Sequence, residues 1–238
     1  MKRPVSCFVI VFAAMTLLAA QAGDAALAKG LRLVEESRTT LAEPALDQAR
    51  DYFATLAKEN PNQAASLYQL ARIDFYRGNA ADLRGDKKSA VAAMELAIGE
   101  AQVSLKADEH SAVAHSLLAD LYGRRIGLGG FMLGPRLGPK IVAENKRALE
   151  LDGNNAVVLA AVGRQYLMAP KMFGGNVEKA IENLQKSTQL DPRADETFVW
   201  LARAYREKGD AASANKALDE ALRLNPRSVF AQNTKAGK

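Results

Sequence analysis

The sequence has few residues suited to catalysis or metal binding. Its 238 residues include one cysteine and two histidines, and aromatic residues make up 6%. Zinc sites, disulfide frameworks and catalytic triads each bring several Cys, His or acidic side chains together. Neither His110 nor His115 has a cysteine or another histidine at metal-ligand spacing. We therefore expect no catalytic residue, no metal and no cofactor.

Alanine is abundant instead, with 44 residues. Because alanine is the best helix former and β-branched residues are comparatively sparse, the composition predicts an all-α protein with closely packed helices. The formal net charge is only +5, and no basic cluster with interleaved aromatic residues is present. We therefore expect no nucleic-acid partner.

The N-terminal residues predict a secretory signal peptide. Two basic residues precede an uncharged apolar run over residues 5–20, and Ala20 and Ala22 place small residues at the cleavage positions. We expect removal of residues 1–22 and export to the periplasm. Cleavage would also remove Cys7, the only thiol. The alternative is an uncleaved segment that anchors the chain in the inner membrane, since the run is just short of a bilayer span.

A helical repeat is clearest near the C-terminus, where residues 194–226 read ADETFVWLARAYREKGDAASANKALDEALRLNP. One apolar stripe has the spacing of a first helix, Gly209 and Asp210 form a turn, a second stripe follows, and Pro226 ends the unit. The stripes are Phe198, Leu201, Ala202 and Tyr205, then Ala214, Leu218 and Ala221. This pattern resembles the tetratricopeptide repeat (TPR), W-x2-L-G-x2-Y, A-x3-F and P over 34 residues. The resemblance implies pairs of antiparallel helices.

The same register recurs upstream with a longer period. The units end at Pro61, Glu109, Gly153, Pro192 and Pro226, which are 48, 44, 39 and 34 residues apart. Each departure from 34 requires an insertion between paired helices or a lengthened helix. We predict one TPR-type solenoid domain over residues 23–238, with about four to five units. Its clearest repeats cover residues 156–192 and 195–228, and a short capping helix is expected over residues 228–232.

Two insertions, residues 123–140 and 167–175, combine glycines with apolar residues. The first holds 6 of the 17 glycines, so we expect a loop there and no helix. Because both insertions leave the solenoid at the same point of neighbouring units, we expect them to lie side by side. They either fold back and bury their apolar side chains, or present them as a lid or a partner contact. These side chains are Phe131, Met132, Met172 and Phe173. Contact with a membrane is expected only through residues 123–140.

The TPR resemblance also implies a concave groove lined by the first helix of each unit. Its groove positions fall on Tyr68, Arg72, Phe75, Asp120, Arg164, Val199, Arg203 and Arg206. Guanidinium groups bind carboxylates in a bidentate manner, so the row of arginines could hold an acidic or extended segment of a protein partner, or its C-terminal carboxylate. The alternative is an internal ladder in which Asp120 pairs with Arg164 or Arg72.

These features favour a non-catalytic protein that binds partner proteins or scaffolds an assembly. The insertions also resemble those of exported bacterial TPR proteins related to the T component of TRAP transporters. That resemblance implies an alternative, a solute-binding accessory of a transporter. A solute role predicts a closed apolar pocket beneath residues 123–140 and 167–175, whereas a scaffold role predicts an open groove.

Overall fold

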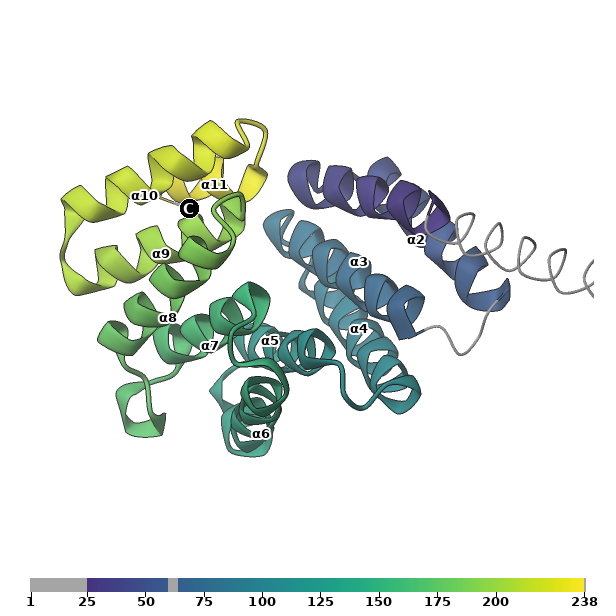
Figure 1. The fold of residues 1–238 in the computed structure, drawn as a ribbon, viewed down its shortest axis with the longest axis horizontal. Coiled ribbons are helices and arrows are strands. Elements are labelled where there is room, and N and C mark those ends of the chain that lie inside the picture. The colour runs from purple at the N-terminus through teal and green to yellow at the C-terminus, as the bar shows by residue number, and fades with distance from the viewer. Residues whose placement is uncertain (1–24, 60–63, 238) are drawn as a thin grey trace, which may run out of the picture.

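The computed structural model describes residues 25–59 and 64–237. All regular structure in these residues is helical, and the helices follow one another as antiparallel pairs (Figure 1). The predicted signal peptide and Pro61 lie outside the described residues. None of the helices in the described part of the chain is both long and apolar enough to cross a membrane.

Five helix pairs and a final short helix make up this fold. A helical segment over residues 25–40 pairs with the first of the following helices. The bounds are α2 (Glu43–Glu59), α3 (Ala64–Leu83), α4 (Lys87–Ala107), α5 (Ala112–Gly129), α6 (Gly134–Asp152), α7 (Ala156–Met168), α8 (Val177–Leu190), α9 (Asp195–Lys208), α10 (Ala211–Leu224) and α11 (Val229–Lys235). Short 3₁₀ turns lie at Phe131–Leu133 (η1) and Lys171–Phe173 (η2). The expected capping helix is α11, which begins after Ser228 and continues beyond its predicted end.

Lengthened helices account for the two longest periods, and the longer connection over residues 169–176 accounts for the 39-residue period. Helices α3 to α6 have 18 to 21 residues, whereas α7 to α10 have 13 or 14. The prediction of a loop over residues 123–140 is wrong, because α5 continues to Gly129 and α6 begins at Gly134. Leu137 is buried in a cluster that also receives Ile126 and Leu128. Packing between the two helices therefore outweighs the low helix propensity of glycine.

The turns at the centre of the two insertions do not lie side by side. No Cα atom of η1 comes within 8 Å of η2. The longer α5 carries η1 beyond the end of the shorter α7, which separates the two turns. In the second insertion, α7 continues to Met168, and Gly174 then turns the chain with a φ of 91° that favours glycine.

Small residues let the paired helices approach closely, as the alanine content predicts. Ala71 and Ala202 are fully buried at equivalent positions of two first helices. Gly163 takes this position in α7, where an added Cβ atom would lie 2.7 Å from Leu184 Cγ on α8. Side chains larger than alanine therefore have no room at this position.

The two ends of the solenoid meet. Arg38 Nη2 lies 2.8 Å from an Asp195 carboxylate oxygen, and Arg227 Nη2 lies 2.6 Å from Glu36. Asn225 Nδ2 donates to Thr39 Oγ1 at 3.0 Å. Figure 1 shows the N-terminal helices of the described chain beside α10 and α11. The solenoid therefore closes into a ring, in contrast to the open groove expected for a scaffold.

Candidate functional site

The predicted groove faces the inside of this ring, which we call the central face. It carries side chains from the first helices α3, α5, α7 and α9. Seven of the eight predicted groove residues retain some exposure, and their partners differ from one to the next. Those partners decide which residues are free to bind another molecule.

Arg164 and Asp120 form an internal ion pair across α7 and α5. Arg164 Nε donates to Asp120 Oδ1 at 3.1 Å, and Nη2 donates to Oδ2. Burial, the largest single influence, acts to lower the pKa of Arg164, but the charge of Asp120, the hydrogen bonds to it and the charge of Glu196 together raise the pKa. The ladder interpretation is therefore confirmed for this pair, and Arg164 is not free to bind an external carboxylate.

Arg72 is held by tyrosines of its own helix. Its guanidinium donates to Gln69 Oε1 at 3.1 Å and to the Tyr76 hydroxyl at 3.3 Å. It also lies 5.8 Å from the ring centroid of Tyr68. Burial raises the pKa of Tyr76 to about 12, so its hydroxyl stays protonated at neutral pH.

Arg203 differs from the other two arginines of the row because it makes neither a hydrogen bond nor an ion pair with any described residue, whereas Arg164 pairs with Asp120 and Arg72 donates to Gln69 and Tyr76. Its guanidinium carbon lies 4.7 Å from the ring centroid of Trp200 and 6.0 Å from that of Phe230. Partial burial lowers the pKa of Arg203, and the neighbouring cations Arg124 and Arg206 lower it further. The central face near α9 therefore carries positive charge that no carboxylate of the described chain neutralises.

Closure of the ring adds charged residues to the central face that the sequence did not predict. Glu196 lies 3.4 Å from Arg38, and its charge also raises the pKa of Arg72 and of Tyr76. Arg38 and Glu196 are 158 positions apart in the sequence, and no local pattern links them. The acidic residues Glu196 and Asp120 thus balance the arginines on one part of the central face only.

One predicted groove residue is buried, and another, although exposed, is bonded to the capping helix α11. Val199 is fully buried in the same apolar cluster as Ala231 of α11, so its assignment to an exposed groove is wrong. Arg206 donates to the Thr234 carbonyl of α11 at 2.8 Å. The capping helix packs against α9 and takes up these positions. Phe75 is half-buried and packs edge-on against Tyr76.

The apolar side chains of the two insertions are strongly exposed. Met132 is 76% exposed, Met172 is 83% exposed and Phe173 is 64% exposed. The interpretation that they fold back and fill the solenoid is therefore wrong for these three. The side chain of Phe131 lies outside the described residues, although its backbone belongs to η1.

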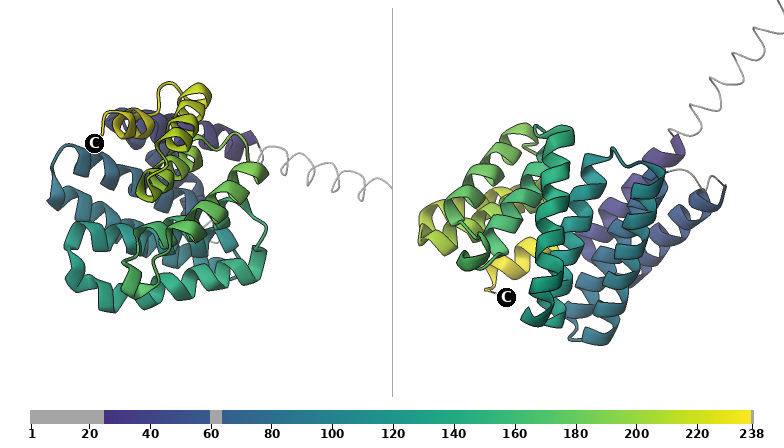
Figure 2. Two further views of the ribbon diagram at one scale, coloured as in Figure 1. Left: turned by 90° about the vertical axis from the view of Figure 1, so that its left-hand side faces the viewer. Right: turned by 90° about the horizontal axis from the view of Figure 1, so that it is seen from below.

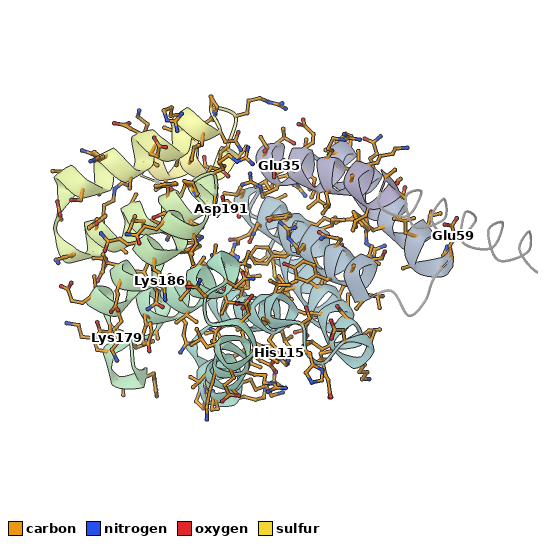
Figure 3. The ribbon with its side chains drawn as sticks, in the orientation of Figure 1. Glu35, Glu59, His115, Lys179, Lys186 and Asp191 are labelled. Atoms are coloured by element: carbon orange, nitrogen blue, oxygen red, sulfur yellow. The ribbon has the colours of Figure 1, made fainter. Side chains whose placement is uncertain are left out.

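A pocket of about 840 Å³ lies between α4, α5 and α6. It is an open pocket with mixed walls, polar at Glu144 and apolar at Leu105 and Leu118, and residues 167–175 do not line it. It therefore differs from the closed apolar pocket expected for a solute role. Beside it, His115 Nδ1 lies 2.6 Å from Glu144 Oε2 (Figure 3). The described residues contain no group of three His, Cys, Asp or Glu side chains placed to hold a metal ion.

A solved TPR protein of similar length shares this arrangement of helix pairs, and other TPR structures resemble the chain at lower TM-scores. TTC0263, a thermophilic TPR protein of Thermus thermophilus, is 20% identical, with 89% of this chain and 97% of that chain covered and a TM-score of 0.60. YrrB, a TPR protein described with an unusual peptide-binding site, is 17% identical over 80% of this chain and 84% of that chain, with a TM-score of 0.41. MamA from Desulfovibrio magneticus RS-1 is 18% identical over 84% of this chain and 94% of that chain, with a TM-score of 0.38. The search of curated proteins found no match.

A family model gives a more specific assignment. The model described as RMD1-3, Regulator of microtubule dynamics protein 1-3, matches residues 33–236. This match covers most of the chain and includes every helix pair of the fold. The chain therefore belongs to the RMD1-3 family and has a TPR-like fold.

Proposed function

We propose that this chain is a non-catalytic interaction module that binds an acidic segment of a partner protein on its central face. The observation that carries the proposal is Arg203, a cation over an aromatic ring with no carboxylate partner among the described residues. An arginine in this setting can donate to a partner's carboxylate while the ring of Trp200 supports an apolar side chain beside it. Regulation of the kind named in the family description would also need a protein partner.

The closed ring suits a binder of short segments. A preformed central face reduces the conformational cost of ordering a flexible peptide on binding. The internal pairs of Arg164 and Arg72 hold the walls in place, and Arg203 supplies the unneutralised charge. Because Arg164 and Arg72 are bonded within the protein and Arg203 is not, the binding region is limited to the α9 side of the ring.

We further propose that the chain acts in the periplasm after removal of residues 1–22. The support is the basic start, the apolar run and the small residues at the cleavage site. An uncleaved segment would place the same module at the inner membrane. The mass of the protein isolated from cell envelopes distinguishes the two, because cleavage removes 22 residues.

Titration with a hexaglutamate peptide tests the role of Arg203. Trp200 is the only tryptophan in the chain and lies beneath Arg203, so its fluorescence reports binding there. Substitution of Arg203 by Ala should weaken binding by about tenfold or more, because a hydrogen bond to a charged group contributes roughly 1.5–3 kcal/mol. Lys216→Ala on the exposed side of α10 is the matched control. Equal affinity of the Arg203→Ala variant and the wild type would refute the proposal.

A further inference from the structure

Three turns lie along one edge of the solenoid, which we call the hairpin edge. They comprise residues 83–88, 130–136 and 168–174, and each joins the first helix of a pair to its second. Because successive pairs stack on one another, these turns face the same side of the molecule (Figure 2). The connections between units lie at the opposite edge.

The hairpin edge carries the five most exposed large apolar side chains of the described residues. Their exposed fractions range from 54% to 83%. They are Leu83, Met132, Met168, Met172 and Phe173, and all three turns contribute. Single exposed apolar residues are ordinary, but concentration of the most exposed ones at one edge indicates an interaction surface.

The same turns carry unpaired positive charge. Five exposed cations there make no ion pair with any described residue: Arg84, Lys87, Lys88, Arg136 and Lys171. The neighbouring acids are occupied, since Asp82 pairs with Arg124 and Asp86 caps α4 by accepting from the Ser89 amide. The hairpin edge is thus apolar and basic together.

One of these cations also occupies a place that local helix stability disfavours. Arg136 lies in the first turn of α6, which has neither an acidic residue nor a side-chain cap, whereas the carboxylate of Asp86 caps α4 beside Lys87 and Lys88. A helix N-terminus carries partial positive charge, so cations there are unfavourable. An anionic surface facing the edge would compensate for this arrangement.

The opposite edge carries exposed acids together with the exposed bases Arg193 and Arg227. The connections between units carry the exposed acids Asp108, Glu109, Asp152 and Asp191. Figure 3 shows a difference between the edges along one helix, with Lys179 towards the η2 end of α8 and Asp191 at its other end.

We propose that the hairpin edge docks on an anionic lipid surface. The apolar side chains project from separate turns, and η1 and η2 have no Cα atoms within 8 Å of each other. They therefore form no continuous groove for a partner helix or strand, whereas a bilayer accepts separate apolar tips between its headgroups. Flexible methionines suit such an irregular interface, and the flanking cations attract anionic headgroups. This surface is distinct from the central face.

Site-specific fluorescence on the full chain tests the proposal. In a Cys7→Ser background, Met172→Cys in η2 and Leu190→Cys at the C-terminal end of α8 each place an environment-sensitive dye on the exposed surface. The probe is a vesicle of phosphatidylcholine and phosphatidylglycerol in equal parts, compared with pure phosphatidylcholine. We expect a blue shift for the dye at residue 172 on the anionic vesicles only, and none at residue 190. This readout separates docking by the hairpin edge from attachment through the N-terminal apolar run.

Substitutions give the second measurement. Lys171→Gln should weaken binding to the anionic vesicles about fivefold and make it less sensitive to salt, whereas Lys186→Gln should leave it unchanged. Absence of a dye shift at residue 172, or equal shifts at residues 172 and 190, would overturn the proposal. A shift at residue 172 on adding a soluble acidic protein, with none on vesicles, would overturn it in favour of a protein partner.

Discussion

A buried carboxylate pair predicts how stability depends on pH. Arg50 Nε lies 3.1 and 3.0 Å from the two oxygens of Asp74, which is almost fully buried, and Arg50 Nη2 donates to Glu100 Oε1 at 3.0 Å. The other oxygen of Glu100 is buried without a hydrogen-bond partner. One arginine therefore serves two carboxylates that lie close together, and burial together with the charge of Asp74 raises the pKa of Glu100 to about 8.

The sign and size of the effect follow from this pKa. The folded protein holds the Glu100 proton more tightly than the unfolded chain, whose Glu pKa is about 4.3. The stabilisation from the bound proton is fully present below pH about 4.3 and is lost as pH rises through about 8. A shift from about 4.3 to about 8 is nearly four units and corresponds to roughly 5 kcal/mol. Glu100→Gln keeps a neutral side chain of the same size and should remove this loss.

Urea unfolding followed by circular dichroism between pH about 5 and about 9 tests this prediction. We expect the free energy of unfolding of the wild type to fall over this range relative to that of Glu100→Gln, so that the variant is the more stable at the alkaline end. Glu207→Gln, at an exposed position of α9, is the control and should follow the wild type. Parallel curves for the wild type and Glu100→Gln would refute the reasoning.

Two further predictions concern packing and ring closure. Gly163→Ala should lower the melting temperature, because the new methyl group collides with Leu184 at a cost of about 1–3 kcal/mol. The control is Gly99→Ala on α4, which meets open space and should raise the melting temperature. A Gly163→Ala variant as stable as the wild type would contradict the close approach of α7 and α8. Arg38→Ala should open the ring, because it leaves the buried carboxylate of Asp195 without its 2.8 Å partner. Small-angle X-ray scattering should then show a larger maximum dimension, and an unchanged profile would show that other contacts hold the ends together.

Much of the fold could be predicted because the repeat signal is local. The 34-residue register of the last two units depends on helix spacing, small contact residues and closing prolines, all of which lie close together in the sequence. The same reasoning failed over residues 123–140, where glycine content predicts a loop. There the helical state depends on packing between α5 and α6, which a composition argument does not include.

The candidate site was predictable only in part. The family pattern placed Arg72, Arg164 and Arg203 in one row, and the Asp120–Arg164 pair was one of the two alternatives. Which arginine remains free could not be predicted, since it depends on the positions of Glu196, the tyrosines of α3 and the capping helix. The burial of Val199 has the same origin, because α11 packs against α9 at the end of the solenoid.

The sequence by itself determined an all-α repeat of antiparallel pairs, because helix propensity and the spacing of small and apolar residues act over one or two turns of the chain. Only the tertiary structure decided that the solenoid closes into a ring, that Arg203 keeps no acidic partner among the described residues, and that the most exposed apolar side chains share one edge. These features arise from contacts between residues far apart in the sequence, such as Arg38 and Asp195, and from the relative lengths of neighbouring helices. Charge pairing and burial depend on distances in space, and the repeat pattern alone does not specify those distances.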